Sequence, residues 1–89
     1  MTDDQILEVI GRYEQALIND GIPTIAHTHE LNCVFPRAAL AHLRTMFPKI
    51  RGFVSDGRRE EAMRSLRFIQ GVLWSCGLAS LDELEDDNR

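Results

Sequence analysis

The sequence has few cysteine and aromatic residues, and it has no long apolar segment. Its 89 residues include two cysteines, one tryptophan and one tyrosine. No apolar run approaches the roughly 18 residues that a membrane-spanning helix requires. The opening stretch MTDDQILEV lacks the basic region and the cleavage site of a secretory signal. We therefore expect a cytoplasmic protein in which Cys33 and Cys76 remain reduced thiols.

Motifs of the common catalytic, nucleotide-binding and metal sites are also missing. The glycines are isolated, so no glycine-rich loop can hold a phosphate, and Ser75 has no nucleophile elbow around it. The segment HTHELNC (27–33) carries two histidines, a glutamate and a cysteine, but their spacing matches no established zinc motif. We expect no enzymatic activity, no metal and no cofactor.

What is present is the composition of an ordinary globular protein, with 44% hydrophobic and 27% charged residues. Residues 1–89 are long enough for a single helical domain. A chain of this size buries only about 60–65% of the surface that its unfolded form exposes. We therefore expect self-association, with a homodimer as the simplest case.

Apolar residues recur at spacings of three and four along three segments, which predicts three amphipathic helices. The first begins at a capping box formed by Thr2 and Gln5 and ends at Gly21. The second begins at Pro36, and Pro48 predicts either a kink or two shorter helices. We expect the second helix to bury one stripe, which consists of Ala39, Leu43, Met46, Ile50 and Phe53. Three further apolar residues are expected to widen this stripe: Leu40, Phe47 and Val54.

The third predicted helix starts near Arg58 and ends at Gly77. A second capping box, formed by Ser80 and Glu83, predicts a short acidic helix over 81–87. Gly52 and Gly71 lie inside helices, where each costs roughly 1 kcal/mol relative to alanine. We expect close approach of a neighbouring helix to compensate for this cost.

Two features exceed what a minimal three-helix bundle requires. The connection over 21–35 is longer than the roughly 2–8 residues usual in bundles. It also carries large apolar residues, so we expect it to pack against the helices. The segment FIQGVLW (68–74) is apolar nearly all the way round, which predicts either a central position or a subunit interface. The expected fold is an oligomeric all-α three-helix bundle with a long loop between helices one and two and a short acidic C-terminal helix.

Charge is distributed unevenly, with a net charge of −5 over 1–35, +5 over 36–67 and −4 over 68–89. One interpretation is charge matching between packed helices. The other is a basic surface for a nucleic acid, a nucleotide or another acidic partner, formed by the predicted helices within 37–67. Its phosphate-binding residues would be Arg44, Lys49, Arg51, Arg58, Arg59, Arg64 and Arg67.

The C-terminal part, MRSLRFIQGVLWSCGLASLDELEDDNR (63–89), resembles a group of small, largely uncharacterised helical proteins of tailed bacteriophages and prophages. The shared pattern is a basic turn, a helix with phenylalanine, glutamine-glycine and leucine-tryptophan, and then a glycine and a short acidic helix. With ALAHL (39–43) and Pro48, the resemblance extends over residues 39–89. The matching positions of its C-terminal part are Gly57, Arg58, Met63, Leu66, Phe68, Gln70, Gly71, Leu73, Trp74, Gly77, Asp82 and Leu84.

This resemblance implies a phage context and a non-enzymatic accessory protein that binds a host or phage protein, in a regulatory or anti-defence role. The long apolar connection and the surplus apolar face favour such protein binding. A structural subunit of a phage assembly is a further alternative. The partner-binding residues expected from the sequence are His27, His29, Glu30, Leu31, Arg58, Arg59 and Trp74.

Overall fold

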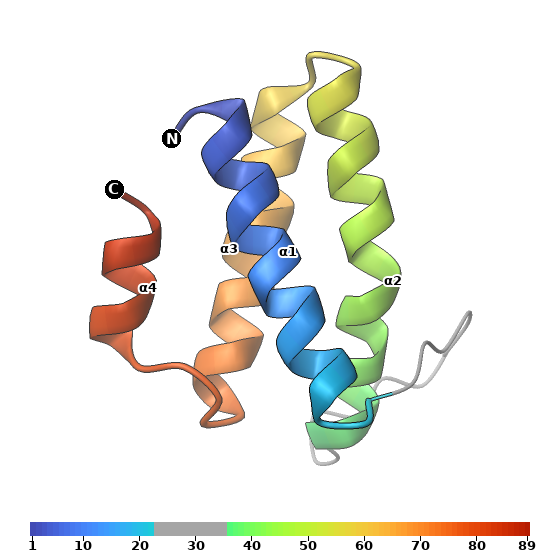
Figure 1. The fold of residues 1–89 in the computed structure, drawn as a ribbon, viewed down its shortest axis with the longest axis vertical. Helices are drawn as coiled ribbons and strands as arrows, with labels where there is room; N and C mark the ends of the chain where they lie inside the picture. Colours follow the sequence, from blue (N-terminus) through green and yellow to red (C-terminus); the bar gives the residue numbers. More distant parts are fainter. Residues whose placement is uncertain (23–35) are drawn as a thin grey trace.

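The computed structural model describes residues 1–22 and 36–89, and these residues form four α-helices (Figure 1). The helices are α1 (Asp3–Asn19), α2 (Pro36–Ser55), α3 (Arg59–Ser75) and α4 (Leu81–Asp87). The described residues contain no strand, so the all-α prediction is confirmed.

The predicted helix starts are confirmed at the capping residues. The Thr2 hydroxyl accepts a hydrogen bond from the Gln5 backbone N–H at 3.2 Å, and the Gln5 side chain accepts one from the Thr2 N–H at 2.7 Å. Ser80 Oγ accepts from the Glu83 N–H at 3.2 Å at the start of α4. The capping box predicted there is only half formed, because the Glu83 carboxylate accepts from the Ser80 hydroxyl and not from the Ser80 backbone N–H. These bonds satisfy donors that would otherwise lack a partner in the first helical turn.

The turn between α2 and α3 depends on Gly57, whose φ of +74° lies in the left-handed region. Its N–H donates to Val54 O, and the Arg58 N–H donates to Phe53 O. A side chain at this φ would be strained, so glycine is the residue that lets the chain reverse here.

Pro48 does not divide α2 into two helices, and that alternative is wrong. The proline is exposed, whereas its neighbours Phe47 and Ile50 are fully buried. Burial of these two side chains holds the turns on either side of Pro48 in place. Packing thus outweighs the cost of the missing backbone hydrogen bond.

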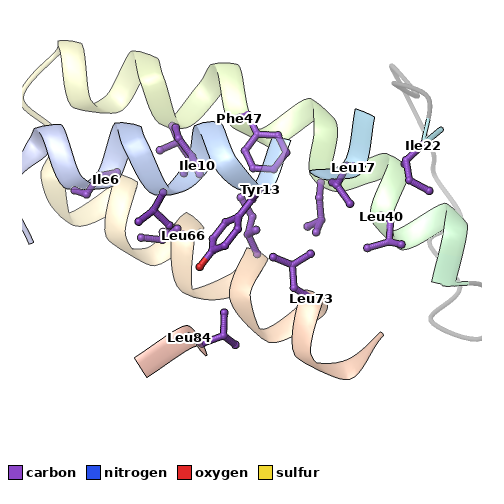
Figure 2. Close-up of a cluster of buried hydrophobic side chains, with 14 of the residues drawn as sticks. Ile6, Ile10, Tyr13, Leu17, Ile22, Leu40, Phe47, Leu66, Leu73 and Leu84 are labelled. Atoms are coloured by element: carbon purple, nitrogen blue, oxygen red, sulfur yellow. The ribbon is translucent and has the colours of Figure 1, made fainter. Parts of the chain in front are cut away.

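The core lies where α1, α2 and α3 pack against one another (Figure 2). Ile6, Ile10 and Leu17 of α1 meet buried side chains of α2 and α3, while α4 contributes Leu84. The buried residues of α2 and α3 that complete the centre are Leu40, Ala41, Leu43, Phe47, Ile50, Ala62, Leu66, Ile69 and Leu73.

The predicted stripe of α2 is confirmed at most positions. Leu43 and Ile50 are buried, as are Leu40 and Phe47, which widen the stripe as expected. Met46 and Phe53 are only half-buried, so the centre of the stripe is displaced toward Phe47. The helix is therefore rotated so that Met46 and Phe53 lie at the edge of the core. This rotation creates the surface described in the next subsection.

The expected close approach at the helical glycines is also wrong. A Cβ built on Gly52 or Gly71 meets no atom within 4 Å among its non-local neighbours, and both residues are exposed. Nothing in the described structure compensates for their low helix propensity.

The apolar segment of α3 is not buried on all sides, so a central position of this helix is wrong. Ile69 and Leu73 are buried, but Phe68 is 53% exposed and Trp74 is 52% exposed. The reason is that α1 and α2 cover only one side of α3. A subunit interface on the exposed side stays a prediction.

Candidate protein-binding groove

An apolar depression lies between α2 and α3 and has a volume of about 360 Å³. Its lining is mostly apolar, and no α1 residue contributes to it. The lining residues are His42, Met46, Lys49, Phe53, Ser65 and Phe68. We call this surface the α2–α3 groove.

Helical spacing explains why these side chains share a surface. On α2 the lining residues recur at i, i+4, i+7 and i+11, which places them on one face of the helix. On α3, Ser65 and Phe68 are three residues apart. Both sets flank the buried stripes that face α1, so the groove runs along the outer side of the α2–α3 contact.

Two cationic side chains contact the groove or its lining residues. Lys49 is an exposed lining residue, and the Arg58 guanidinium lies 5.3 Å from the centre of the Phe53 ring, a cation–π contact. Arg58 also donates to the Glu61 carboxylate at 3.2 Å. A hydrogen bond from the Glu61 backbone N–H, together with this contact to Arg58, lowers the pKa of Glu61.

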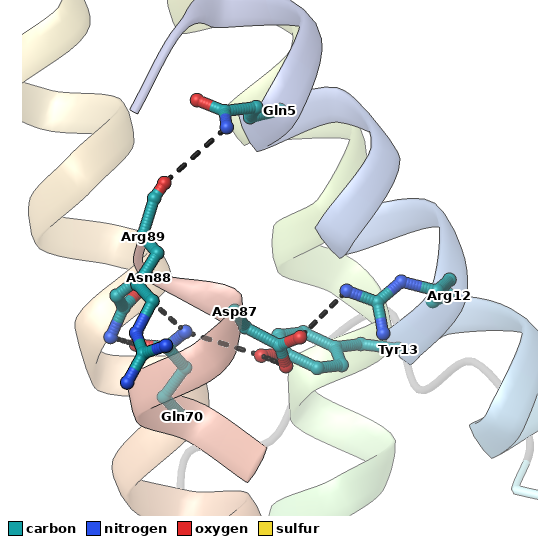
Figure 3. Close-up of polar contacts among 7 residues, drawn as sticks. All are labelled: Gln5, Arg12, Tyr13, Gln70, Asp87, Asn88 and Arg89. Carbon is teal, nitrogen blue, oxygen red and sulfur yellow. Dashed lines mark hydrogen bonds and ion pairs between the residues drawn. The ribbon is translucent and has the colours of Figure 1, made fainter. Parts of the chain in front are cut away.

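A second polar cluster, the α4 network, joins α4 to α1 and α3 (Figure 3). The Asp87 carboxylate accepts hydrogen bonds from Arg12 at 2.7 Å and from the Tyr13 hydroxyl at 2.6 Å. The Gln70 side-chain amide donates to the Tyr13 oxygen at 3.1 Å and to Asn88 Oδ1 at 2.9 Å. Asn88 returns a hydrogen bond to Gln70 Oε1 at 3.1 Å.

The α4 network holds α4 against α1 and α3. Burial and the hydrogen bond to Asp87 raise the pKa of Tyr13 well above its ordinary value, so its proton stays in place at neutral pH. The hydrogen bond to Asp87 also raises the pKa of Arg12. Arg12, Tyr13 and Asp87 are among the residues that line an adjoining cavity of about 220 Å³.

The seven predicted phosphate-binding residues do not act as one free basic surface. Three of them form ion pairs, which are Arg51 with Glu14 at 2.7 Å, Arg58 with Glu61 at 3.2 Å and Arg59 with Asp3 at 3.9 Å. These pairs agree with charge matching, both between helices and within α3.

The other four basic residues differ in their surroundings. Arg44 donates to the Ile22 carbonyl at 2.9 Å, and its buried Nε has no hydrogen-bond partner in the part of the chain that is described. Lys49, Arg64 and Arg67 are exposed and form no ion pair with any described residue. Lys49 lines the α2–α3 groove, and Arg64 lies one helical turn before Phe68.

Three of the seven predicted partner-binding residues lie in the part of the chain that is described, and Trp74 lies near the opposite end of α3 from Arg58 and Arg59. The predicted positions His27, His29, Glu30 and Leu31 lie outside the described residues. Arg58 lies at the α2–α3 turn and Arg59 pairs with α1. Trp74 is exposed on α3 but does not line the groove.

Sequence reasoning did not identify the groove as a binding surface. Its signal was present in the sequence as His42, Met46, Lys49 and Phe53 at helical spacing. Apolar periodicity places Met46 and Phe53 in the buried stripe predicted for α2. Periodicity alone does not fix the rotation of a helix about its axis, so it does not separate core residues from residues that flank the core.

The described part of the chain contains no cluster of three or more residues suited to hold a metal ion. None of its helices combines the length and the apolar character needed to cross a membrane. Its features are those of a small all-α protein with an apolar groove on one side. Comparisons with models of known protein families, with curated proteins and with solved structures found no match.

Proposed function

We propose that the protein is a non-enzymatic binding protein that captures a segment of another protein in the α2–α3 groove. The observation that carries the proposal is Phe68, a large apolar side chain that is 53% exposed and lines the depression together with Met46 and Phe53. Large apolar side chains that gather in an exposed groove commonly mark binding sites.

In this proposal α1, α2 and α3 form a three-helix bundle, and α1 packs on the side of the α2–α3 pair that lies opposite the groove. Leu43, Ile50 and Leu66 are fully buried in this bundle, so the groove has a rigid base. A preformed surface loses little conformational entropy when a partner binds, which favours recognition.

The resemblance of residues 39–89 to small phage proteins supplies the proposed context. In that context the captured protein is a host or phage protein, and its capture has a regulatory or anti-defence role in the cytoplasm of a bacterial host. Nucleic-acid binding is less well supported, because Arg51, Arg58 and Arg59 already face carboxylates of the same chain.

The test compares proteins captured by three tagged forms of the chain from bacterial lysate, with and without nuclease treatment, and identified by mass spectrometry. The forms are the wild type, Phe68→Ala and the matched control Trp74→Ala. Phe68 and Trp74 lie on the same helix with nearly equal exposure, 53% and 52%, but only Phe68 lines the groove. We expect one protein to be retained by the wild type and by Trp74→Ala and to be lost with Phe68→Ala.

Equal capture by all three forms would contradict the proposed groove. Loss only with Trp74→Ala, or only after alanine substitution of His27, His29, Glu30 and Leu31, would return the binding surface to the residues expected from the sequence. Capture that disappears on nuclease treatment would favour the nucleic-acid alternative, since phosphate contacts dominate such binding.

A further inference from the structure

We propose that the segment recognised by the α2–α3 groove is an acidic amphipathic helix, in which carboxylates flank a row of large apolar side chains. This inference rests on the proposed function, because it names the chemistry of the partner at the same groove. It follows from three properties of the described residues: the shape of the groove, its apolar floor and the charges at its edge.

The shape favours a helix. The groove runs between two adjacent helices joined by a tight turn, and the furrow between two packed helices accepts the side-chain ridge of a third. Addition of an extended strand requires a free sheet edge, and the described residues contain no strand. A partner must therefore bind here through side chains.

The apolar floor of the groove favours a partner with large apolar side chains. The apolar residues of the lining are Met46, Phe53 and Phe68, and Met46 has an unbranched side chain that adapts to the shape of a ligand. Ser65, between Phe68 and the α2–α3 turn, is small and leaves room beside the Phe68 ring. A row of leucine or phenylalanine side chains fits this lining.

The positive charges at the edge of the groove favour carboxylates on the partner. Lys49 lines the groove and Arg64 directly precedes the lining residue Ser65, and neither cation forms an ion pair with a described residue. Among the described residues, no carboxylate lines the groove. The carboxylate on the same face of α3, Glu61, is already engaged by Arg58. An acidic partner would therefore gain ion pairs, whereas a basic partner would meet uncompensated positive charge.

The experiment uses two fluorescein-labelled synthetic peptides of about 15 residues, enough for about four helical turns. Both carry leucine at i, i+4, i+7 and i+11. One has glutamate at the flanking positions, and its twin has lysine at every glutamate position. Binding is measured by fluorescence anisotropy with the wild-type chain, Phe68→Ala, Lys49→Glu and the control Trp74→Ala.

We expect the acidic peptide to bind the wild type and Trp74→Ala with similar affinity. Phe68→Ala should weaken binding about thirtyfold, as expected for a central aromatic contact. Lys49→Glu should weaken it about threefold to tenfold, with less effect at high salt, because the charge lies at the exposed edge. The lysine twin should bind at least tenfold more weakly than the acidic peptide. Because Phe68 is half-exposed, its alanine variant should fold, which circular dichroism verifies.

The overturning results are distinct from one another. Equal binding of both peptides, lost with Phe68→Ala, would overturn the acidic chemistry and leave the groove as a protein-binding surface. The inference would also be overturned if the acidic peptide did not bind, or if Phe68→Ala left its binding unchanged. The proposed function would then depend on the lysate comparison alone. A wild-type dimer that Phe68→Ala dissociates in sedimentation analysis would assign the groove to a second copy and overturn the inference.

Discussion

Removal of the Tyr13 hydroxyl should destabilise the protein, because this hydroxyl links α1 to α4 and α3. In Tyr13→Phe the ring keeps its place in the core, where the residue is 8% exposed, and only the oxygen is lost. The oxygen donates to the Asp87 carboxylate at 2.6 Å and accepts from Gln70 Nε2 at 3.1 Å. The variant therefore isolates the contribution of the hydroxyl's two hydrogen bonds.

The loss of unfolding free energy in Tyr13→Phe depends on the hydrogen bonds that Asp87 and Gln70 retain. A hydrogen bond to a charged group contributes about 1.5–3 kcal/mol. Asp87 keeps its contact with Arg12 and Gln70 keeps its contacts with Asn88, so neither is left without a partner. We expect a loss near the lower end, about 1.5–2 kcal/mol of unfolding free energy. In a chain of this size that corresponds to a fall in Tm of roughly 5–15 °C.

Alkaline pH provides an independent check of the same contact. The folded state raises the pKa of Tyr13, so the stabilisation is fully present below the unfolded pKa of about 10 and is lost as pH rises above it. Wild-type stability should therefore fall toward that of Tyr13→Phe above pH about 10. Because the chain has one tyrosine, the phenolate absorbance reports this residue alone.

The assay is urea unfolding followed by circular dichroism from neutral to alkaline pH, with Arg12→Gln as the matched control. Arg12 contacts the same carboxylate, but its side chain is 55% exposed, so its loss should cost no more than about 1 kcal/mol. The reasoning is refuted if Arg12→Gln costs as much as Tyr13→Phe. It is also refuted if the folded phenol titrates at an ordinary pKa.

Four further substitutions test the helices themselves, each measured by urea unfolding. Gly71→Ala should stabilise the protein by about 1 kcal/mol, because the added methyl meets open space. Gly57→Ala should destabilise it by about 1–2 kcal/mol, because the φ of Gly57 is left-handed. A stabilising Gly57→Ala together with a destabilising Gly71→Ala would contradict the glycine geometry. Pro48→Ala should raise the unfolding free energy by about 1–2 kcal/mol, since an exposed interior proline is replaced by the best helix former. Leu84→Ala should cost about 2–3 kcal/mol, because Leu84 is 7% exposed in the core; an unchanged urea midpoint would show that α4 is not docked in solution.

The helices were largely predictable because their signals are local. Thr2 with Gln5, Pro36 and Gly57 determine ends and turns through their own backbone chemistry, independently of distant partners. The apolar periodicity likewise identified which segments are helical. These signals are read within one or two helical turns.

The groove and the α4 network were not predictable for two different physical reasons. The apolar stripe of α2 is wide, and only packing against α1 and α3 decides that Phe47 enters the core while Met46 and Phe53 flank it. The network pairs Arg12 and Tyr13 with Asp87, about 75 residues along the chain. In the sequence, Asp87 is one of several acidic residues near Leu84, and nothing local distinguishes it as the partner of Tyr13.

The separation between Tyr13 and Asp87 has a consequence for how the protein fluctuates. The α2–α3 pair closes a short loop, whereas docking of α4 onto α1 closes a loop spanning most of the chain, which costs more entropy. Amide hydrogen exchange should therefore be fastest in α4, the element that opens first. Such opening leaves Phe53 and Phe68 where they are, because the groove belongs to α2 and α3 alone. The molecule can thus lose and regain its last helix many times while a bound partner stays in place.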